Sequence, residues 1–396
     1  MQRFRNPISS GFQVFAERPE KVRLCENNNM RFLIRWAAYR RMFAVLGCLV
    51  VLSLMLLSLS LMDTRTDRHA TWTVDLKHKK LLHQHVHDVL QGQCRPHGTR
   101  KDLLTRLPAS SHKTHPFLWR NEPISDTLFL YPLPFGFRGL QTKVERLQRL
   151  LPASDSVTEP VHTSSQCRRC VVVGNGGILK GLELGSLIDR FDTIIRLNSG
   201  PLGQFSVDVG NRTSIRLSYP ESTPVDWVDT DPLTVFVAVL YKGVDLSWTS
   251  AMINKLPVPL WDWLFFWKKV PDQIPLDSSR FRILNPQVIK EAALDLLKYP
   301  PPRFHLWGWD QNIPTLGVSA LNLASLLCDE VSLAGFGYNL TQQGASLHYY
   351  DHLPMSFMQG QKMHDVNKET ELLQSLVREG TLTDLTGGIH CSFCTS

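Results

Sequence analysis

One short stretch sets the architecture of this chain, Cys170-Val-Val-Val-Gly-Asn-Gly-Gly177. Its three valines form an apolar run of the kind found in strands that are buried on both faces. A glycine-rich turn ends the run, and residues 179–188 follow with the spacing of a helix. A strand, a tight turn and a helix in this order begin a βαβ unit, so the stretch predicts an α/β fold.

The same alternation of strands and helices continues towards the C-terminus. Pro286 suits the first turn of a helix, and the prolines at 300–302 stop that helix. Strands that alternate with helices of about 10–15 residues are typical of a parallel sheet. We therefore predict a single Rossmann-like domain with a mainly parallel sheet. The predicted strands are Thr193–Leu197, 215–217, 233–240 and 331–333, and the predicted helices are 143–151, 286–297 and 317–327.

The turn that contains Asn175 has the parts needed to bind phosphate. Free backbone N–H groups and the positive end of a following helix both favour negative charge. We expect the Asn175 amide either to face a ligand or to serve a left-handed turn, which asparagine tolerates. The dinucleotide fingerprint G-x-G-x-x-G is incomplete here, but Asp192 stands where a ribose-binding acid would follow. A nicotinamide-dependent oxidoreductase is therefore an alternative.

A second pattern, Asp229-Thr-Asp231, resembles the D-x-D that holds a divalent cation in many nucleotide-sugar transferases. Pro232 follows at once, and residues 224–232 have the composition of an exposed acidic loop. D-x-D also occurs often by chance, so we predict no metal site.

Two segments near the C-terminus place histidines beside acids, Leu347-His-Tyr-Tyr-Asp-His352 and His364-Asp-Val-Asn-Lys-Glu369. Histidine is the side chain best suited to take a proton from a sugar hydroxyl near neutral pH. His348 and His364 are therefore candidate catalytic residues, with a structural histidine as the alternative at each position.

The chain of 396 residues has a formal net charge of +7, which at first favours a nucleic-acid partner. Residues 1–41, however, hold nine Lys and Arg against three Asp and Glu. From Asp63 onwards the balance is 34 to 33. The predicted folded part is nearly neutral, so we expect no nucleic-acid groove.

Residues 42–62 form an uncharged apolar run between Arg41 and Asp63. A helix of this length, at about 1.5 Å per residue, is about 30 Å long and matches the hydrocarbon core of a bilayer. The run is longer than a signal-peptide core and begins far from the N-terminus, so we expect an uncleaved signal anchor. The expected organisation is a cytosolic tail at 1–41, a transmembrane anchor at 42–62, a stem at 63–93 and a luminal domain at 94–396.

The orientation of this anchor does not follow from charge, because five Lys and Arg lie within 20 residues on each side. Both N-x-S/T sequons, at Asn211 and Asn339, lie C-terminal to the anchor. Four of the six cysteines on that side can be given disulfide roles, which need an oxidising compartment. We therefore expect a type II protein whose C-terminal part lies in a lumen.

The stem at 63–93 is polar and histidine-rich. The spacing of its histidines matches no standard set of metal ligands. We expect a solvated, partly disordered segment here, with a metal site as the alternative. The histidines concerned are His78, His83, His85 and His87.

Four motifs, in order, are similar to the sialylmotifs of animal sialyltransferases. The large motif is Cys170 through Asn198, followed by Asp208-Val-Gly-Asn-Arg-Thr213. The small motif begins at Pro314-Thr-Leu-Gly and ends in Cys-Asp-Glu-Val-Ser-Leu-Ala-Gly-Phe-Gly-Tyr338. The third is His348-Tyr-Tyr-Asp, and the very small one is His364-x-x-x-x-Glu. On these motifs the chain resembles the sialyltransferase family.

The resemblance implies a variant glycosyltransferase-A fold, CMP-sialic acid as the donor, and no metal or other cofactor. His364 would be the general base on the galactose 3-hydroxyl, supported by Glu369, and His348 would stabilise the departing CMP phosphate. These roles are chemically consistent, because a sugar hydroxyl needs a base and a leaving phosphate needs a partner for its charge. Direct displacement would invert the anomeric carbon. The residues implied for CMP-sialic acid binding are Asn175, Gly176, Asn198, Gly317 and Tyr349.

Within the family, the chain is most similar to the branch that acts on lactosylceramide, through stretches such as Cys167-Arg-Arg-Cys170 and Asp384-Leu-Thr-Gly-Gly-Ile389. This implies a galactose-terminated glycolipid acceptor, a ganglioside product and the Golgi membrane. A glycoprotein or oligosaccharide acceptor is an alternative. A membrane-anchored glycan-binding protein without catalysis is a more distant one, which the presence of both His348 and His364 argues against. The sequence leaves a homodimer open.

The family resemblance also pairs Cys170 with Cys328, and it leaves Cys94 as the luminal partner of Cys167. Cys391 and Cys394 can pair with each other, pair between chains or stay free.

The stretch Leu260-Trp-Asp-Trp-Leu-Phe-Phe-Trp-Lys-Lys269 has the composition of an interfacial element. We expect it to lie near the membrane or the ceramide, with a buried helix as the alternative.

Overall fold

The computed structural model describes residues 42–56, 75–153, 167–302, 313–337, 346–360 and 363–394. The chain divides into two compact units, Met1–His69 and Ala70–Ser396. In the first unit residues 42–56 form a helix. Among the described residues no helix is both long and apolar enough to cross a membrane. The predicted anchor at 42–62 extends beyond the described part of the chain and stays a prediction.

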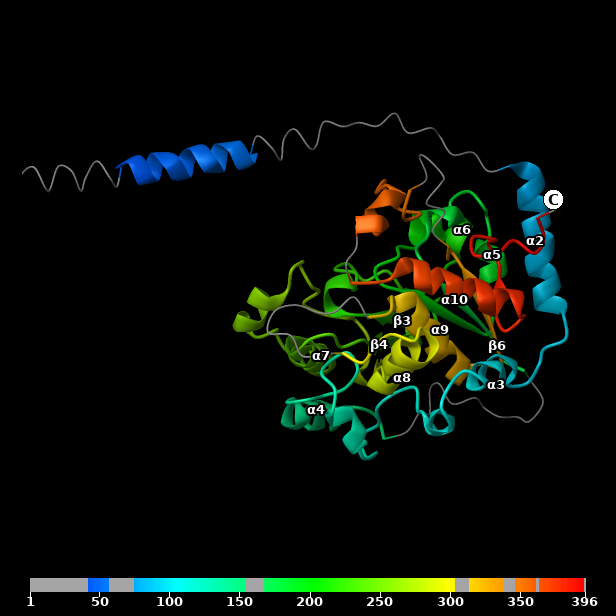
Figure 1. The fold of residues 1–396 in the computed structure, drawn as a ribbon, viewed down its shortest axis with the longest axis horizontal. Coiled ribbons are helices and arrows are strands. Elements are labelled where there is room, and N and C mark those ends of the chain that lie inside the picture. The colour runs from blue at the N-terminus through cyan, green and yellow to red at the C-terminus, as the bar shows by residue number, and fades with distance from the viewer. Residues whose placement is uncertain are drawn as a thin grey trace, which may run out of the picture. The chain divides into compact units, whose positions relative to one another are not determined.

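The second unit is built on one parallel sheet (Figure 1). Within the described residues the sheet has seven strands in the order β5-β4-β3-β2-β1-β6-β7, and each neighbouring pair is parallel. The prediction of an α/β domain with a mainly parallel sheet is therefore confirmed. The strands are β1 Arg169–Val173, β2 Thr193–Leu197, β3 Ile215–Ser218, β4 Val235–Ala238, β5 Phe281–Ile283, β6 Glu330–Ala334 and β7 Thr383–Asp384.

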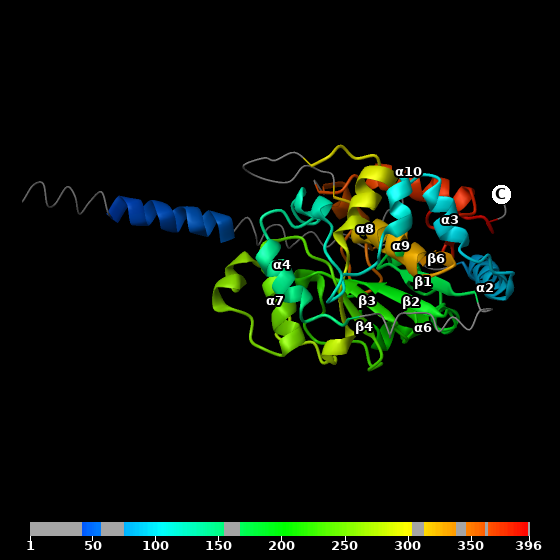
Figure 2. The ribbon, with the colours of Figure 1, turned by 90° about the horizontal axis from the view of Figure 1, so that it is seen from below.

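Helices cover both faces of the sheet (Figure 2). Helices α3, α8, α9 and α10 pack on one face, whereas α2, α5 and α6 pack on the other face over β1 and β2. Helices α4 and α7 cover β4 and β5 on that second face. The bounds are α2 Leu76–Gln91, α3 Gly98–Leu104, α4 Gln141–Gln148, α5 Gly185–Ile188, α6 Ser206–Val209, α7 Gly243–Asn254, α8 Pro286–Lys290, α9 Leu316–Leu327 and α10 Val366–Arg378.

Strand β1 lies in the middle of the domain, as its valines predict. Val171 and Val172 point to opposite faces, and both side chains are fully buried in the clusters on those two faces. Burying such a side chain contributes about 1.5–3 kcal/mol. The run of valines is therefore held by packing on both sides of the sheet.

The helix predicted over 179–188 forms only in part. A 3-10 turn covers Gly177–Leu179, and α5 begins at Gly185. Between them Gly181 and Glu183 have φ values of +79° and +54°, a left-handed conformation that interrupts a right-handed helix. The carboxylate of Asp208 accepts hydrogen bonds from the N–H groups of both residues, each at 2.9 Å. Asp208 thereby stabilises the break.

Helix α2 shows that the expectation of a solvated segment is wrong for residues 76–91. Leu82 and Val86 are fully buried against the domain. The ring of His83 hydrogen-bonds the Leu182 carbonyl at 2.8 Å, and that of His85 bonds the Asp384 carbonyl at 3.2 Å. The helix escaped prediction because only two buried apolar positions, i and i+4, mark its inner face among Lys and His. The described residues contain no cluster of three or more His, Cys, Asp or Glu arranged to hold a metal ion.

Three disulfides tie the second unit together. Cys170–Cys328 joins β1 to the end of α9, and Cys94–Cys167 joins the segment after α2 to the start of β1. Both pairs are as predicted. The third is Cys391–Cys394, so the two C-terminal cysteines pair with each other. On the chain-entropy model, the Cys170–Cys328 loop of 158 residues is worth about 4–5 kcal/mol of stability.

Candidate active site

The order of the strands indicates where a ligand binds. The chain runs from β1 to β5 in one direction across the sheet and then returns to β6 on the other side of β1. Open parallel sheets bind ligands outside the carboxyl ends of the strands at such a reversal. Here β1 and β6 run into Gly174 and Gly335, so the candidate site begins at these two glycines.

The glycine-rich turn after β1 is a close-packed element. The N–H groups of Gly174, Gly176 and Gly177 donate to the carbonyls of Ala334, Gly335 and Leu347 at 2.8–3.1 Å. The expectation that these amides face a ligand is therefore wrong. A Cβ at position 176 would lie 2.5 Å from the Gly335 carbonyl oxygen, and one at 177 would lie 2.1 Å from that of Ser346. Glycine is required here because the loops after β1 and β6 touch.

The turn places Asn175 against the segment 346–350. The Asn175 carbonyl accepts a hydrogen bond from the Tyr349 N–H at 3.0 Å. A Cβ at Gly200 would lie 2.4 Å from Asn175 Oδ1 and 2.9 Å from the Tyr349 hydroxyl. Tyr349 donates its hydroxyl to the Pro201 carbonyl at 2.7 Å. The structure thus brings together Asn175, Tyr349 and the loop after β2.

The loop after β2 begins at Asn198, which has a left-handed φ of +55°. Asparagine adopts this conformation more readily than most residues. Its Oδ1 atom is buried and has no hydrogen-bond partner among the described residues. Buried polar atoms are nearly always paired, so an unpaired one at the carboxyl edge of a sheet marks a place for a ligand donor. The sequence-based assignment of Asn198 to ligand binding stays a prediction, which this geometry favours.

Arg216 on β3 fixes this loop in place. Its Nη1 donates to the Asn198 and Gly200 carbonyls at 3.0 and 3.1 Å. The other side of the guanidinium forms a fully buried pair with Asp229, with Nε and Nη2 at 2.8 and 2.6 Å from the two carboxylate oxygens. Asp229 also accepts from the Thr213 hydroxyl at 2.5 Å. Asp229 therefore positions the loop through Arg216.

This geometry overturns the view of residues 224–232 as a wholly exposed acidic loop. The D-x-D alternative also fails, because the Asp229 carboxylate is enclosed by Arg216 and Thr213. Asp231 caps a local turn by accepting from the Leu233 N–H at 2.8 Å.

The oxidoreductase alternative fails on the position of Asp192. This residue precedes β2 and accepts a hydrogen bond from the Arg169 N–H, at the start of β1, at 2.7 Å. It therefore lies at the amino edge of the sheet. A ribose-binding acid must reach the carboxyl edge, where Asn175 and Asn198 lie.

His348 is held on two sides. Its Nδ1 lies 2.6 Å from Asp351 Oδ2, and its ring stacks on that of Tyr350 with 5.1 Å between centroids and an angle of 1°. Its backbone forms a bridge to Gly176. The ring is partly exposed, so Nε2 is the atom left to meet a ligand beside the turn.

His364 has a defined tautomer. Its Nδ1 lies 2.7 Å from the Ile313 carbonyl oxygen. A carbonyl can only accept, so Nδ1 carries the proton and the neutral ring presents a lone pair at Nε2. Burial lowers the pKa of His364, and the bond to Ile313 opposes that shift. The ring is therefore a neutral base at pH 7.

Glu369 bonds the same segment as His364, at Thr315, two residues after Ile313. Its two carboxylate oxygens accept from the Thr315 N–H at 2.7 Å and from the Thr315 hydroxyl at 2.5 Å. Burial raises the pKa of Glu369 to about 7, against the effect of these hydrogen bonds. Glu369 was expected to support His364, and the structure shows that both side chains grip the segment 313–315 that leads into α9.

A known protein family matches the part of the chain that contains this site. Residues 117–381 match the family described as glycosyltransferase family 29 (sialyltransferase). The chain belongs to this family of sialyltransferases.

Several curated sialyltransferases are similar over most of their length. The chain is 45% identical over 342 residues to human lactosylceramide alpha-2,3-sialyltransferase, covering 86% of this chain and 81% of the relative. It is 44% identical over 353 residues to the rat protein of that name, covering 87% and 90%. It is 36% identical over 308 residues to human CMP-N-acetylneuraminate-beta-1,4-galactoside alpha-2,3-sialyltransferase, covering 76% and 78%.

Solved sialyltransferase structures share the fold. A crystal structure of a mammalian sialyltransferase matches with a TM-score of 0.55 at 24% identity, covering 68% of this chain and 89% of that one. A complex of a mammalian sialyltransferase with Gal-beta-1-3GalNAc-ortho-nitrophenol gives a TM-score of 0.54.

The large and small sialyltransferase motifs meet at Phe336, a residue to which the sequence analysis assigned no role. A Cβ at Gly317, in the first turn of α9, would lie 2.8 Å from the Phe336 ring, and one at Gly174 would lie 3.2 Å from it. Phe336 therefore separates the turn after β1 from the start of α9. Its sequence signals are its place in the small motif and its position between Gly335 and Gly337.

Other residues missed by sequence reasoning are Ile313, Thr315 and Arg216, which position the predicted site residues. Of the two sequons, Asn211 is exposed, as a glycan acceptor must be. Asn339 lies outside the described residues.

Proposed function

We propose that this sialyltransferase moves sialic acid from CMP-sialic acid to the 3-hydroxyl of a terminal galactose, with inversion and without a metal. The observation that carries the proposal is the hydrogen bond from His364 Nδ1 to Ile313. It leaves Nε2 of a neutral imidazole as the base that a sugar hydroxyl needs.

The donor would lie along the carboxyl edge of the sheet. Asn175 and Asn198 would contact the nucleotide and its phosphate, beside Tyr349. The unpaired Oδ1 of Asn198 is suited to a hydroxyl or amino donor. Gly317, in the first turn of the 12-residue helix α9, would close the nucleotide site, where the helix end favours negative charge.

The chemical step is a single displacement. The galactose O3 attacks the anomeric carbon of sialic acid on the side opposite CMP, and its proton passes to His364 Nε2. The bond between that carbon and the phosphate oxygen breaks, and its electron pair leaves with CMP. When His348 is protonated, Nδ1–H donates to Asp351 and Nε2–H is available to the leaving phosphate. Attack from the opposite side inverts the anomeric configuration.

For the acceptor we propose lactosylceramide, which would give a monosialylated ganglioside. The support is the set of relatives named lactosylceramide alpha-2,3-sialyltransferase, at 44–46% identity. A galactoside on a glycoprotein or oligosaccharide is the second candidate, since the relatives named for beta-1,4-galactosides are 36–39% identical.

We further propose that the protein is a type II protein of the Golgi membrane with its catalytic domain in the lumen. The apolar run at 42–62 would be the anchor. The three disulfides support an oxidising compartment.

The test is an acceptor panel. The purified full chain is incubated in detergent with CMP-sialic acid and lactosylceramide, other galactose-terminated glycolipids, a desialylated glycoprotein or free lactose, with and without a chelator. We expect most transfer to lactosylceramide, a new alpha-2,3 linkage and no loss with the chelator. Preference for the glycoprotein would shift the acceptor to the second candidate. The absence of transfer to every acceptor would refute catalysis.

A further inference from the structure

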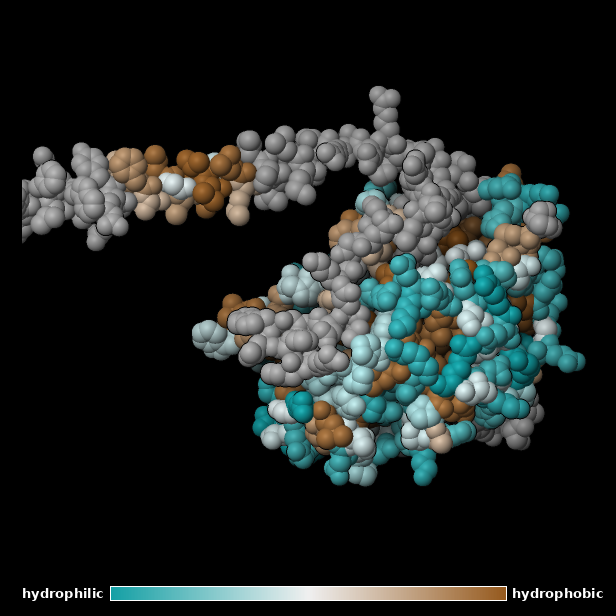
Figure 3. All heavy atoms as spheres, viewed as in Figure 1, coloured by the Kyte–Doolittle hydropathy of each residue, from teal (hydrophilic) through white to brown (hydrophobic). Residues whose placement is uncertain are grey.

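The 3-10 helix η6, Leu260–Phe265, projects from the domain beside α7 (Figures 1 and 2). Large apolar side chains at its surface are exposed to solvent by 63–85%, and hydrophobic atoms gather at the end of this projection in Figure 3. Soluble proteins rarely expose so much apolar surface in one place without a binding partner. We call these five residues the apolar tip: Leu260, Trp261, Leu264, Phe265 and Trp267.

The segment has an inner and an outer side. Trp263 and Phe266 are partly buried, meet edge to face at 6.3 Å and pack against the core beneath α7. Val270, where the segment ends, is fully buried. Two aromatic side chains therefore anchor the segment, whereas the five tip residues point away from the domain. The alternative of a buried helix is wrong for these five.

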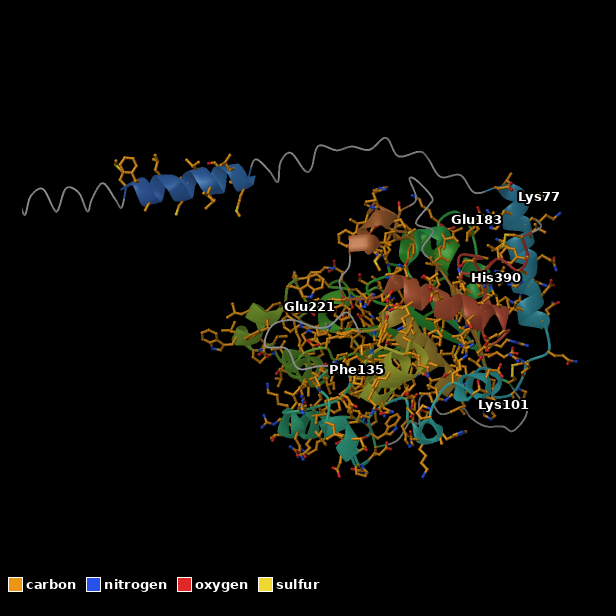
Figure 4. The ribbon with its side chains drawn as sticks, viewed as in Figure 1. Lys77, Lys101, Phe135, Glu183, Glu221 and His390 are labelled. Carbon is orange, nitrogen blue, oxygen red and sulfur yellow. A yellow bond between two sulfur atoms is a disulfide. The ribbon has the colours of Figure 1, made fainter. Side chains whose placement is uncertain are left out.

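The inner side is joined to the carboxyl edge of the sheet. The ammonium group of Lys242 lies 4.9 Å from the centre of the Phe266 ring and pairs with the buried carboxylates of Glu221 and Asp245. Figure 4 labels Glu221, which follows β3, while Lys242 follows β4. The tip is thus fixed to the edge of the sheet where the candidate active site lies.

Tyr241, the residue before Lys242, extends this connection along the carboxyl edge of the sheet. The ring of Tyr241 meets that of Tyr219 edge to face at 5.2 Å. Burial raises the pKa of the Tyr241 hydroxyl, and the charge of Glu369 adds to that shift. The contacts therefore lead from the tip through Lys242 and Tyr241 to Tyr219, which follows β3 at the carboxyl edge of the sheet.

Positive charge surrounds the tip. Residues 255–269 contain three lysines and one acid. Lys255, Lys268 and Lys269 are exposed, whereas the acid, Asp262, is partly buried and directs Oδ2 inward. Tryptophan rings and lysine side chains are both amphipathic and suit the boundary between acyl chains and polar headgroups.

We propose that the apolar tip docks into the interfacial layer of the lipid bilayer that displays the acceptor glycolipid. The choice of this bilayer rests on the proposed function. The ceramide holds the acceptor sugar close to the membrane surface, so an active site attached to a membrane-docked tip meets the sugar without extracting the lipid. A lipid surface fits the lysines and the amphipathic tryptophans better than a protein partner does, because interface cores are depleted in lysine.

The proposal is tested on the full chain reconstituted into vesicles of phosphatidylcholine, phosphatidylserine and lactosylceramide. The variant is Trp261→Ser/Trp267→Ser, and the control is Leu130→Ser/Val207→Ser, which removes two apolar residues exposed to a similar extent elsewhere. We expect the tip variant to lose about tenfold in kcat/KM on vesicle-bound lactosylceramide, through lost interfacial binding. Transfer to soluble lactose should be unchanged, and the control should match the wild type in both assays. Equal activity of the tip variant and the wild type on both acceptors would overturn the proposal.

A second readout does not depend on the acceptor. Brominated phosphatidylcholine should quench part of the tryptophan fluorescence of the wild type, and the tip variant should lack that part. If quenching is seen but lactosylceramide is not sialylated, the proposed acceptor fails and the docking surface stands. If the tip variant retains the quenched part, the docking surface fails whatever the acceptor. Conversion of a wild-type dimer to a monomer by the tip substitutions would instead assign the tip to a second copy of the chain, and would overturn the proposal.

Discussion

The carboxylate of Glu369 accepts two hydrogen bonds from Thr315, one from its backbone N–H at 2.7 Å and one from its hydroxyl at 2.5 Å. His364, five residues earlier, bonds the carbonyl of Ile313. Residues at and just before the start of α10 therefore hydrogen-bond the segment that leads into α9 at two points. The candidate base and the helix end that would close the nucleotide site share one support.

The stability of the domain should depend on the protonation of Glu369. Its pKa in the folded state, about 7, lies above the ordinary value of 4.5. Its contribution to stability is therefore fully present below about pH 4.5 and is lost as the pH rises through about 7. The shift corresponds to about 3 kcal/mol. Glu369→Gln should remove this pH dependence, as measured by urea unfolding at acidic and alkaline pH. An identical pH dependence in both proteins would contradict the assignment.

The acid limb of the pH–rate profile should lie at a pH below the ordinary pKa of histidine. Burial lowers the pKa of His364 below the ordinary histidine value, so Nε2 takes up a proton only at a lower pH than in an ordinary histidine. We expect kcat/KM to fall only at lower pH, as read from a pH–rate profile. His364→Asn keeps a donor for Ile313 but lacks the base, and should lower kcat by about 10²–10⁴ while calorimetry shows retained CMP binding. Substantial turnover by this variant would eliminate His364 as the base.

Breaking the buried ion pair of Arg216 and Asp229 should lower the stability of the domain. Asp229→Asn leaves a fully buried guanidinium without its counter-charge, which should cost about 3–5 kcal/mol of stability. The loop after β2 should also loosen, because Arg216 binds two of its carbonyls, so KM for CMP-sialic acid should rise. Asp231→Asn is the matched control, with a loss below about 1 kcal/mol. Equal losses in the two variants would show that the buried pair has no special role.

The glycine at position 176 should not tolerate alanine. The added Cβ would lie 2.5 Å from the Gly335 carbonyl, a backbone atom that cannot move alone. We expect a loss of more than about 2 kcal/mol, from overpacking between the loops after β1 and β6. At Gly243, where the nearest atom to a new Cβ is 3.4 Å away on a Leu140 side chain, alanine should be nearly neutral. Chemical denaturation of both variants checks this, and a neutral Gly176→Ala would disprove the close packing.

Sequence reasoning succeeded where a pattern is local. The valines of β1 mark a central strand, and Thr193–Leu197 is a strand with the predicted bounds. Strand β5 was missed because it has three residues and a buried arginine, Arg282, in its middle.

At the candidate site, prediction from local patterns reached less far than it did for the fold. Its motif residues were found through resemblance, whereas their supports depend on contacts between distant parts of the chain. Glu369 and Thr315 are 54 positions apart, and no local pattern links them. Asp229 was assigned to an exposed loop because its partner, Arg216, looked like an ordinary strand residue.

Helix α2 provides the last prediction, on where the folded domain begins. Leu82 and Val86 are fully buried against β1 and its neighbours, so the helix stabilises the domain although it lies before the predicted boundary at residue 94. Leu82→Ala should lower stability by about 2–5 kcal/mol. Leu76→Ala is the control, because Leu76 is 78% exposed. Thermal unfolding followed by circular dichroism distinguishes the two, and equal melting temperatures would mean that α2 is a dispensable part of the stem.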